Sequence, residues 1–273
     1  MFGLLILVFA WIMAWNRFQW FSAFQRHTFP VLWMGYILTV NALCFSRSGT
    51  CPVVEFPFRF IALFFLSSFF WWFFEYLNRF VQNWHYQGVE RFTAMEYMAF
   101  ASLSFSTVLP AVYSTYRWLA SFERVNSGLS RFPAFRPCRH RSIAVAILIL
   151  SGAGLFLIGV LPDFLFPLLW VSPLLTVTAI QVLSGRPHIF SSLQHGDWRE
   201  VVLGPWSALI CGLFWEMWNF HSLAKWTYAV PFVDRFHVFE MPVLGYGGYL
   251  PFGLECLMIC RMVPGWSRDG AWG

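Results

Sequence analysis

Two glutamates that follow very aromatic stretches are the first candidates for chemistry. Glu75 follows Phe-Trp-Trp-Phe-Phe at 70–74, and Glu216 follows Leu-Phe-Trp at 213–215. An ionisable residue within a membrane is costly and is usually functional. Burial favours the protonated form of a carboxyl, which can then act as a general acid. Asn78 and Asn219 follow at i+3, on the same helical face. Each Glu–Asn pair could therefore serve acid/base chemistry, or it could join helices by hydrogen bonds.

Aromatic residues follow both glutamates at matched positions. Trp84-x-Tyr86 comes after Glu75, and Trp226-x-Tyr228 comes after Glu216. Tryptophan and tyrosine also form belts at membrane interfaces, which is the alternative reading. As site residues, they predict an aromatic lining for a substrate pocket. We add two further aromatic residues to that lining, Trp215 and Tyr246.

A second polar motif follows each aromatic pair. Val-Glu-Arg-Phe at 89–92 leads to Glu96, and Val-Asp-Arg-Phe at 233–236 leads to Glu240. The acidic and arginine side chains of the two Val-acid-Arg-Phe stretches could form ion pairs between the two copies. Glu96 and Glu240 are each expected in the first turn of a helix, where the helix dipole favours an acidic residue. Asp234, His237 and Glu240 are spaced i, i+3, i+6, which loosely suits a metal on one helical face. Since no known metal signature matches, we predict no metal site, and the sequence specifies no cofactor.

These motifs belong to a longer pattern in which the chain resembles itself. Phe-Pro-x-Leu-Trp at 29–33 recurs at 166–170, and Leu109-Pro110 recurs as Leu250-Pro251. Together with the Glu-x-x-Asn and the Val-acid-Arg-Phe motifs, the matches keep one order and offsets of 137 to 144 residues. We interpret this as an internal duplication.

The composition indicates a membrane protein. The chain has 273 residues, of which 58% are hydrophobic and 11% are charged, whereas soluble domains have roughly 25% charged residues. The apolar residues form eight runs near the length that spans a bilayer. These runs are 2–16, 28–45, 55–77, 95–119, 142–161, 164–183, 201–219 and 240–262. We predict an all-α, polytopic membrane helix bundle of about eight transmembrane helices, built from two parallel four-helix repeats. The six cysteines show no C-x-x-C pair and are predicted to be core residues.

A basic segment divides the two repeats. We place the first repeat at 1–119, the linker at 120–141, and the second repeat with a short tail at 142–273. The linker carries Arg124, Arg131, Arg136, Arg139 and Arg141, so it should face the cytoplasm. Counting spans then puts both termini in the cytoplasm and both glutamate motifs on the other side. The expected location is a bacterial inner (plasma) membrane.

The leading functional prediction is an integral-membrane enzyme that acts on a lipid or isoprenoid/terpenoid-type substrate. Glu216 would be the general acid/base. Asn219, His221, His237 and Glu240 would be its positioners or proton partners, and Glu75 with Asn78 would be a supporting copy. The expected partner is a membrane lipid or a hydrophobic small molecule, and no basic patch suggests nucleic acid. A transporter or lipid-binding channel and a scaffold or assembly factor remain alternatives. The sequence specifies neither the reaction nor the oligomeric state.

Overall fold

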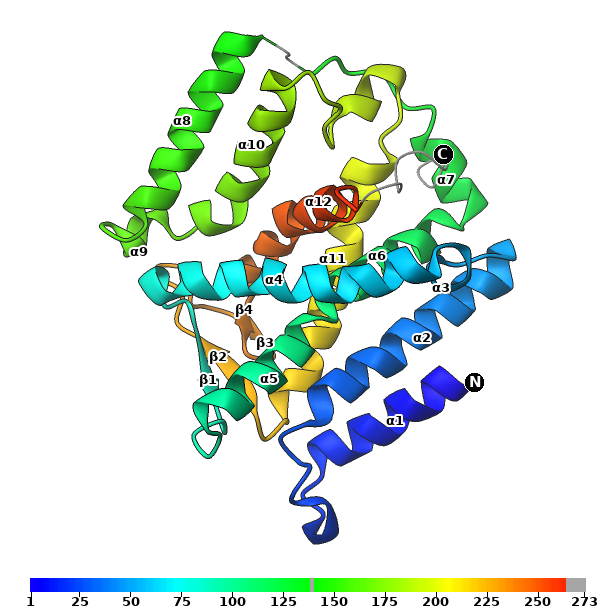
Figure 1. The fold of residues 1–273 in the computed structure, drawn as a ribbon, viewed down its shortest axis with the longest axis vertical. Coiled ribbons are helices and arrows are strands. Elements are labelled where there is room, and N and C mark those ends of the chain that lie inside the picture. The colour runs from blue at the N-terminus through cyan, green and yellow to red at the C-terminus, as the bar shows by residue number, and fades with distance from the viewer. Residues whose placement is uncertain (138–139, 264–273) are drawn as a thin grey trace.

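The computed structural model describes residues 1–137 and 140–263, and within them the chain is mostly helical (Figure 1). Arg139 and Cys138 lie outside the described residues, as does the tail from residue 264. The helices and strands are α1 (Phe2–Trp15), α2 (Thr28–Ser48), α3 (Pro52–Glu55), α4 (Pro57–Val81), β1 (Trp84–Gln87), α5 (Ala94–Phe105), α6 (Val108–Ala120), α7 (Glu123–Leu129), α8 (Arg141–Leu157), α9 (Pro162–Leu165), α10 (Leu168–Leu183), α11 (Arg199–Phe220), β2 (Lys225–Tyr228), β3 (His237–Val238), β4 (Met241–Pro242) and α12 (Tyr249–Cys260). Short 3-10 turns are η1 (Gln19–Phe21), η2 (Ser191–His195) and η3 (Val243–Gly248).

Among the described residues, four helical segments are long and apolar enough to cross a membrane. They are α2, α4, α11 and the continuous segment Val243–Cys260, which joins η3 to α12. The remaining predicted runs contain shorter helices, such as α1 with 14 residues and α10 with 16. A helical membrane protein is therefore a sound description, while the count of eight spans stays a prediction.

The helices form two outer pairs around a central group. α1 packs on α2 at one side of the molecule and α8 packs on α10 at the other, with α4, α6, α11 and α12 between them (Figure 1). α11 and α12 approach closely because two glycines meet: a Cβ atom on Gly253 would lie 2.3 Å from the carbonyl oxygen of Gly204. Small residues permit such close helix contacts in membranes.

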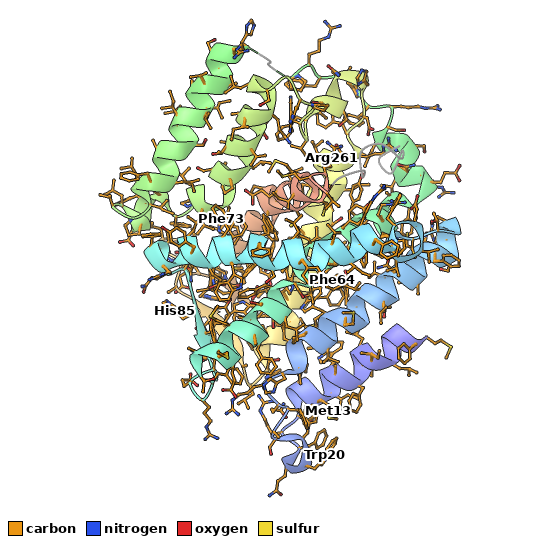
Figure 2. All side chains as sticks on the ribbon, in the orientation of Figure 1. Met13, Trp20, Phe64, Phe73, His85 and Arg261 are labelled. Atoms are coloured by element: carbon orange, nitrogen blue, oxygen red, sulfur yellow. The ribbon has the colours of Figure 1, made fainter. Side chains whose placement is uncertain are left out.

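The core is strongly aromatic. Trp33, Phe74, Tyr113 and Trp218 are fully buried. Many other apolar side chains are exposed instead, including Phe65 and Phe73 of α4. Figure 2 shows such side chains around the ribbon, with Phe73 labelled. Outward-facing apolar side chains on long helices fit contact with lipid.

The predicted run 95–119 is broken in two. Pro110 cannot donate a backbone hydrogen bond to the residue four positions earlier, which ends regular helix there. Ser67 of α4 stabilises the break, because its hydroxyl donates to the carbonyl of Phe105 (2.5 Å) and accepts from the backbone N–H of Leu109 (3.0 Å). The result is two helices, α5 and α6, which are separated by Ser106 and Thr107.

The two acidic residues expected at helix starts behave differently. Glu96 lies in the first turn of α5, as predicted, and it also forms a capping box with Thr93. Glu240 does not start a helix: it lies between β3 and β4, and its carboxyl binds Lys225 (2.5 Å). That prediction was wrong because the motif folds into a short hairpin, with His237 opposite Pro242.

The basic linker is more ordered than a simple connection. It contains α7, and its extended part is bonded to the residues before α11: the backbone N–H of Phe132 donates to Gly196 (2.9 Å) and the Trp198 indole to Pro133 (2.9 Å). The linker therefore covers the start of α11.

Candidate functional site

The two asparagines of the matched motifs hold the strands that follow them. The Asn78 carboxamide donates to the carbonyl of Trp84 (2.8 Å) and accepts from the backbone N–H groups of Asn83 (2.8 Å) and Trp84 (3.3 Å). Asn219 donates to the carbonyl of Trp226 (2.7 Å) and accepts from the N–H of the same residue (2.8 Å). Each carboxamide thus bonds to strand backbone and not to the neighbouring glutamate, and each fixes the tryptophan at or near the start of its strand.

These strands come from the two halves of the chain and pair with each other. β1 and β2 are antiparallel, with Trp84 opposite Tyr228 and Tyr86 opposite Trp226. The Trp of each strand faces the Tyr of the other, so the pairing is self-complementary, as at a two-fold interface. Alternate residues of a strand share one face, so the four rings gather on one side of the ribbon.

Glu216 lies behind this ribbon on α11 and is completely buried. Its Oε1 atom accepts hydrogen bonds from the hydroxyls of Tyr228 (2.6 Å) and Tyr249 (2.9 Å). The indole of Trp226 in turn donates to the Tyr228 hydroxyl (2.7 Å). The Oε2 atom of Glu216 is buried and has no hydrogen-bond partner.

Glu75 on α4 is held in a related way. Its Oε1 atom accepts from the Trp71 indole (2.9 Å), the Trp84 indole (3.0 Å) and the Tyr86 hydroxyl (2.6 Å). Both glutamates therefore bind the tyrosine of the strand that follows in their own half. Because the strands pair, the two carboxyl clusters lie at the same end of the helix bundle.

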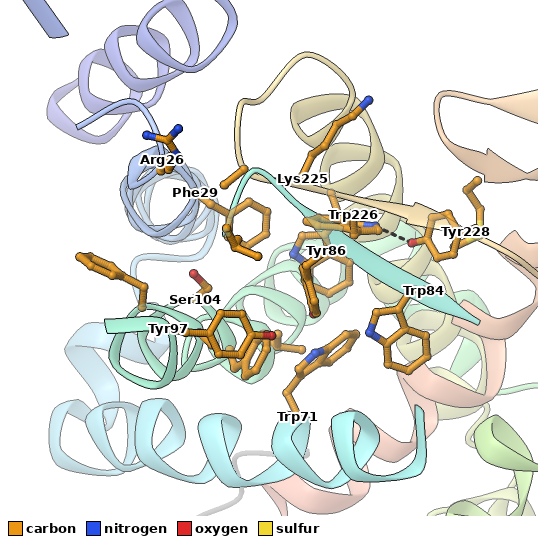
Figure 3. A pocket seen from close by; sticks show the side chains of 18 of the residues that line it. Arg26, Phe29, Trp71, Trp84, Tyr86, Tyr97, Ser104, Lys225, Trp226 and Tyr228 are labelled. Atoms are coloured by element: carbon orange, nitrogen blue, oxygen red, sulfur yellow. Dashed lines mark hydrogen bonds between the residues drawn. The ribbon is translucent and has the colours of Figure 1, made fainter. Parts of the chain in front are cut away.

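The ring donors from both clusters line one cavity of about 160 Å³ (Figure 3). This volume is close to that of a cavity that accepts one benzene molecule. The wall includes all six rings of the two hydrogen-bonded clusters, together with Tyr97 and Ser104 of α5, Trp170 of α10 and Trp215 of α11. Arg26 and Lys225 also contribute to it. Neither Glu75 nor Glu216 is part of the wall, so each carboxyl stands behind the rings that donate to it.

The two strand tyrosines remain protonated. Burial, and then the nearby glutamate, raises the pKa of Tyr86 and of Tyr228 well above the usual value for tyrosine. A protonated hydroxyl can donate to a carboxyl while its oxygen still accepts a hydrogen bond. Each tyrosine therefore connects a buried carboxyl to the cavity surface.

The structure brings together most of the predicted residues. Trp84, Tyr86, Trp215, Trp226 and Tyr228 line the cavity as expected of a pocket wall. Two residues with important contacts were missed, Trp71 and Tyr249. Trp71 is four positions before Glu75, one helical turn away, and this spacing could have indicated it. Tyr249 comes from a distant helix, and no spacing links it to Glu216.

The other predicted residues make no hydrogen bond to either carboxyl. His221 is exposed and its ring packs on Trp15 (4.9 Å between centroids). His237 is exposed and pairs with Asp234 (2.7 Å). Glu240 is occupied by Lys225, and the Tyr246 hydroxyl donates to the carbonyl of Val238 (3.1 Å).

The segment whose spacing loosely suited a metal on one helical face is not a helix. Asp234, His237 and Glu240 do not share a helical face, since this segment is a hairpin. Within residues 1–137 and 140–263, no three histidine, cysteine or acidic side chains are grouped as metal ligands would be.

The chain matches no protein-family model, no curated protein and no solved structure.

Proposed function

We propose that this protein is an integral-membrane enzyme that binds an apolar lipid or isoprenoid substrate in the aromatic cavity. The observation that carries the proposal is the convergence of two buried carboxyl clusters, through their ring donors, on one cavity. A mostly aromatic wall suits a hydrocarbon ligand, and a buried carboxyl close to that wall suits proton transfer.

Glu216 is the proposed general acid/base, acting through Tyr228. In the reactive state the Glu216–Tyr228 hydrogen bond is reversed from the observed one, in which Tyr228 is the donor: the protonated carboxyl donates to the tyrosine oxygen and the hydroxyl points into the cavity. The carboxyl proton then passes to the tyrosine oxygen while the tyrosine proton adds to one carbon of a substrate double bond. The electron pair of the double bond forms the new C–H bond, the other carbon becomes a carbocation, and Glu216 is left as a carboxylate. Loss of a proton from a neighbouring carbon by the reverse route forms a shifted double bond and restores Glu216. Atoms and charge balance without a further reactant.

Glu75 is the proposed supporting carboxyl. It accepts three ring donors, whereas Glu216 accepts two and keeps a buried oxygen without a partner. A carboxyl with fewer hydrogen bonds is less stabilised as a carboxylate, so Glu216 is better suited to hold and release a proton.

The duplication and the topology belong to the same proposal. Matched contacts of the two Glu–Asn motifs, and the self-complementary pairing of β1 with β2, support two parallel repeats around an axis along the membrane normal. Eight segments, a cytoplasmic linker with cytoplasmic termini, and a bacterial inner membrane complete it. Cysteine labelling from each side of the membrane, at position 127 of α7 and at His85 of β1, tests the orientation, which requires opposite sides.

The test of function compares lipid extracts by mass spectrometry. Cells that express the parent chain, Glu216→Gln or Glu75→Gln are analysed alongside cells without the protein. Glu216→Gln should abolish a lipid change that the parent produces, with a loss of about 100-fold or more, the usual contribution of general acid/base catalysis. Glu75→Gln should retain most of it. Unchanged lipid conversion by a folded Glu216→Gln variant would falsify the acid/base role.

A non-catalytic lipid-binding protein is the second candidate. It is favoured by one observation, that neither carboxyl reaches the cavity wall. It predicts that the parent chain carries a bound lipid through purification and converts none, and loss of uptake without lipid conversion would indicate a transporter.

A further inference from the structure

We infer that the cavity prefers ligands with a bulky, weakly hydrated cationic group. The positive charge is either permanent, as in a quaternary ammonium group, or develops during the reaction, as in a carbocation. The inference rests on the proposed function, since it names the charge of the substrate state that the same site would stabilise.

The first observation concerns the orientation of the rings. Six aromatic rings have their polar edge engaged in hydrogen bonds: three on Glu75, two on Glu216 and one on Tyr228. All six also line the cavity. The edge of an aromatic ring is its positive part and the face is its negative part. Because these polar edges are engaged with carboxyl oxygens or, for Trp226, with a hydroxyl oxygen, the ring faces are the electrostatic surface available to a ligand.

The second observation is that the buried carboxyls have no cationic partner. Buried charges are normally paired with an opposite charge or neutralised by a proton. Among residues 1–137 and 140–263, the ion pairs involve other acids, and neither Glu75 nor Glu216 has one. When either glutamate has lost its proton, the protein supplies no counter-charge, and a cation in the cavity would supply it.

The third observation concerns the two basic residues of the wall. Lys225 is neutralised by Glu240 (2.5 Å between Nζ and Oε1), and the guanidinium of Arg26 donates to the carbonyl of Gly88 (2.8 Å). Both groups are thus engaged at one end of the β1–β2 ribbon, where Lys225 lies opposite Gln87, and neither forms an ion pair with Glu75 or Glu216. The remainder of the wall is rich in tryptophan, the strongest aromatic partner for a cation.

Two kinds of ligand carry such a positive charge. A carbocation formed by protonating a double bond is a transient ligand, and a quaternary ammonium headgroup is a permanent one. Both are bulky cations with weak hydration, which is the type that aromatic cages select.

The test uses the full chain in lipid nanodiscs and a matched pair of probes. Decyltrimethylammonium carries the cation, and 2,2-dimethyldodecane has the same shape without charge. Binding is read from tryptophan fluorescence, with empty nanodiscs to correct for partition into lipid. The ammonium probe should bind at least about tenfold more tightly than the neutral probe, as expected for a desolvated cation–π site.

Variants connect that preference to the cavity. Trp170→Leu removes a wall ring that makes no hydrogen bond to a carboxyl, and the double variant Glu75→Gln, Glu216→Gln removes both groups that can carry a negative charge. Each should reduce the preference to about threefold or less while retaining affinity for the neutral probe, which also shows that the variant is folded. Trp206→Leu, an exposed ring on α11 outside this cavity, is the control and should change nothing.

Two outcomes overturn the inference, and they differ in what else they affect. Equal affinity of the parent chain for both probes removes the cation preference but leaves the acid/base proposal to its own lipid test. Failure of both probes to bind removes the ligand cavity itself, and with it the proposed function. Tight ammonium binding without lipid conversion in cells supports a permanent headgroup over a transient carbocation.

Discussion

The Glu75 and Glu216 clusters use the same parts but obtain their last hydrogen bond from different places. In both, an asparagine one turn later fixes the next strand and the tyrosine of that strand donates to the glutamate. Around Glu75 a further donor is Trp71, four residues earlier on the same helix. Around Glu216 the position four residues earlier is Gly212, and the donor is Tyr249 from α12.

The glycine is what makes the second arrangement possible. A Cβ atom on Gly212 would lie 2.4 Å from the ring of Tyr249, so any side chain there would displace that ring. The residue before Leu109-Pro110 is Val108, whereas the residue before Leu250-Pro251 is Tyr249. One cluster thus combines Trp71 on α4 with Val108 on α6, whereas the other combines Gly212 on α11 with Tyr249 on α12. Each buried carboxyl therefore has several ring donors, but the segment that supplies them can differ.

The largest expected effect tests whether Asn78 and Asn219 stabilise the fold by holding the backbone of the strands that follow them. Asn78→Leu leaves three backbone groups without this partner and Asn219→Leu leaves two. At roughly 1–3 kcal/mol for each buried group left unpaired, the free energy of unfolding should fall by about 3 kcal/mol or more for Asn78 and by about 2 kcal/mol for Asn219. Denaturant titration in detergent measures both. Asn16→Leu, at an exposed site, is the control. Equal effects at all three positions would contradict the proposed role of Asn78 and Asn219 in holding the strands.

The next effect isolates the arrangement around Glu216. Gly212→Ala should push Tyr249 away from the carboxyl and cost about 1–3 kcal/mol, as overpacking does, with a marked loss of lipid conversion. Thermal unfolding and the lipid assay measure the two consequences. Gly247→Ala, where an added Cβ meets nothing within 4 Å, is the matched control. A stable and active Gly212→Ala variant would show that Tyr249 is dispensable.

A smaller effect compares the two strand tyrosines. Tyr228→Phe leaves Glu216 with one donor and leaves the Trp226 indole without its partner, so we expect a loss of about 2 kcal/mol in unfolding free energy. Tyr86→Phe leaves Glu75 with two indole donors, and about 1 kcal/mol is expected. Only Tyr228→Phe should reduce lipid conversion more than tenfold. The reverse order in either measurement would reassign the main carboxyl to Glu75.

The smallest effect concerns the second polar motif, where the halves differ most. Thr93→Ala removes the cap of α5 and should cost about 1 kcal/mol. His237 is the corresponding residue in the other half and is exposed, so His237→Ala should change stability by less than about 0.5 kcal/mol. Circular dichroism melts of both variants provide the comparison, and a larger effect at His237 would indicate a role that its Asp234 contact does not explain.

Some of the site was predictable from the sequence, and the reasons are local. Glu75 and Asn78, like Glu216 and Asn219, share a helical face at i, i+3, and their separation from the aromatic pairs is short. The strands themselves were missed, although Trp-x-Tyr alternation suits a strand. Their pairing joins Trp84 to Tyr228 across 144 positions, and no local pattern encodes such a distance.

The sequence by itself determined the apolar character of the helices, their approximate positions and the matched pairs of carboxyl and carboxamide. These depend on composition and on the helical period, which a single segment already expresses. The tertiary structure alone places five ring donors on the two glutamates and a sixth on Tyr228, puts the carboxyls behind the cavity wall and makes Tyr249 a donor to Glu216. Those features arise where segments far apart in the chain meet. A buried carboxyl has no contact with water, so its hydrogen-bond donors come from the segments that pack against it.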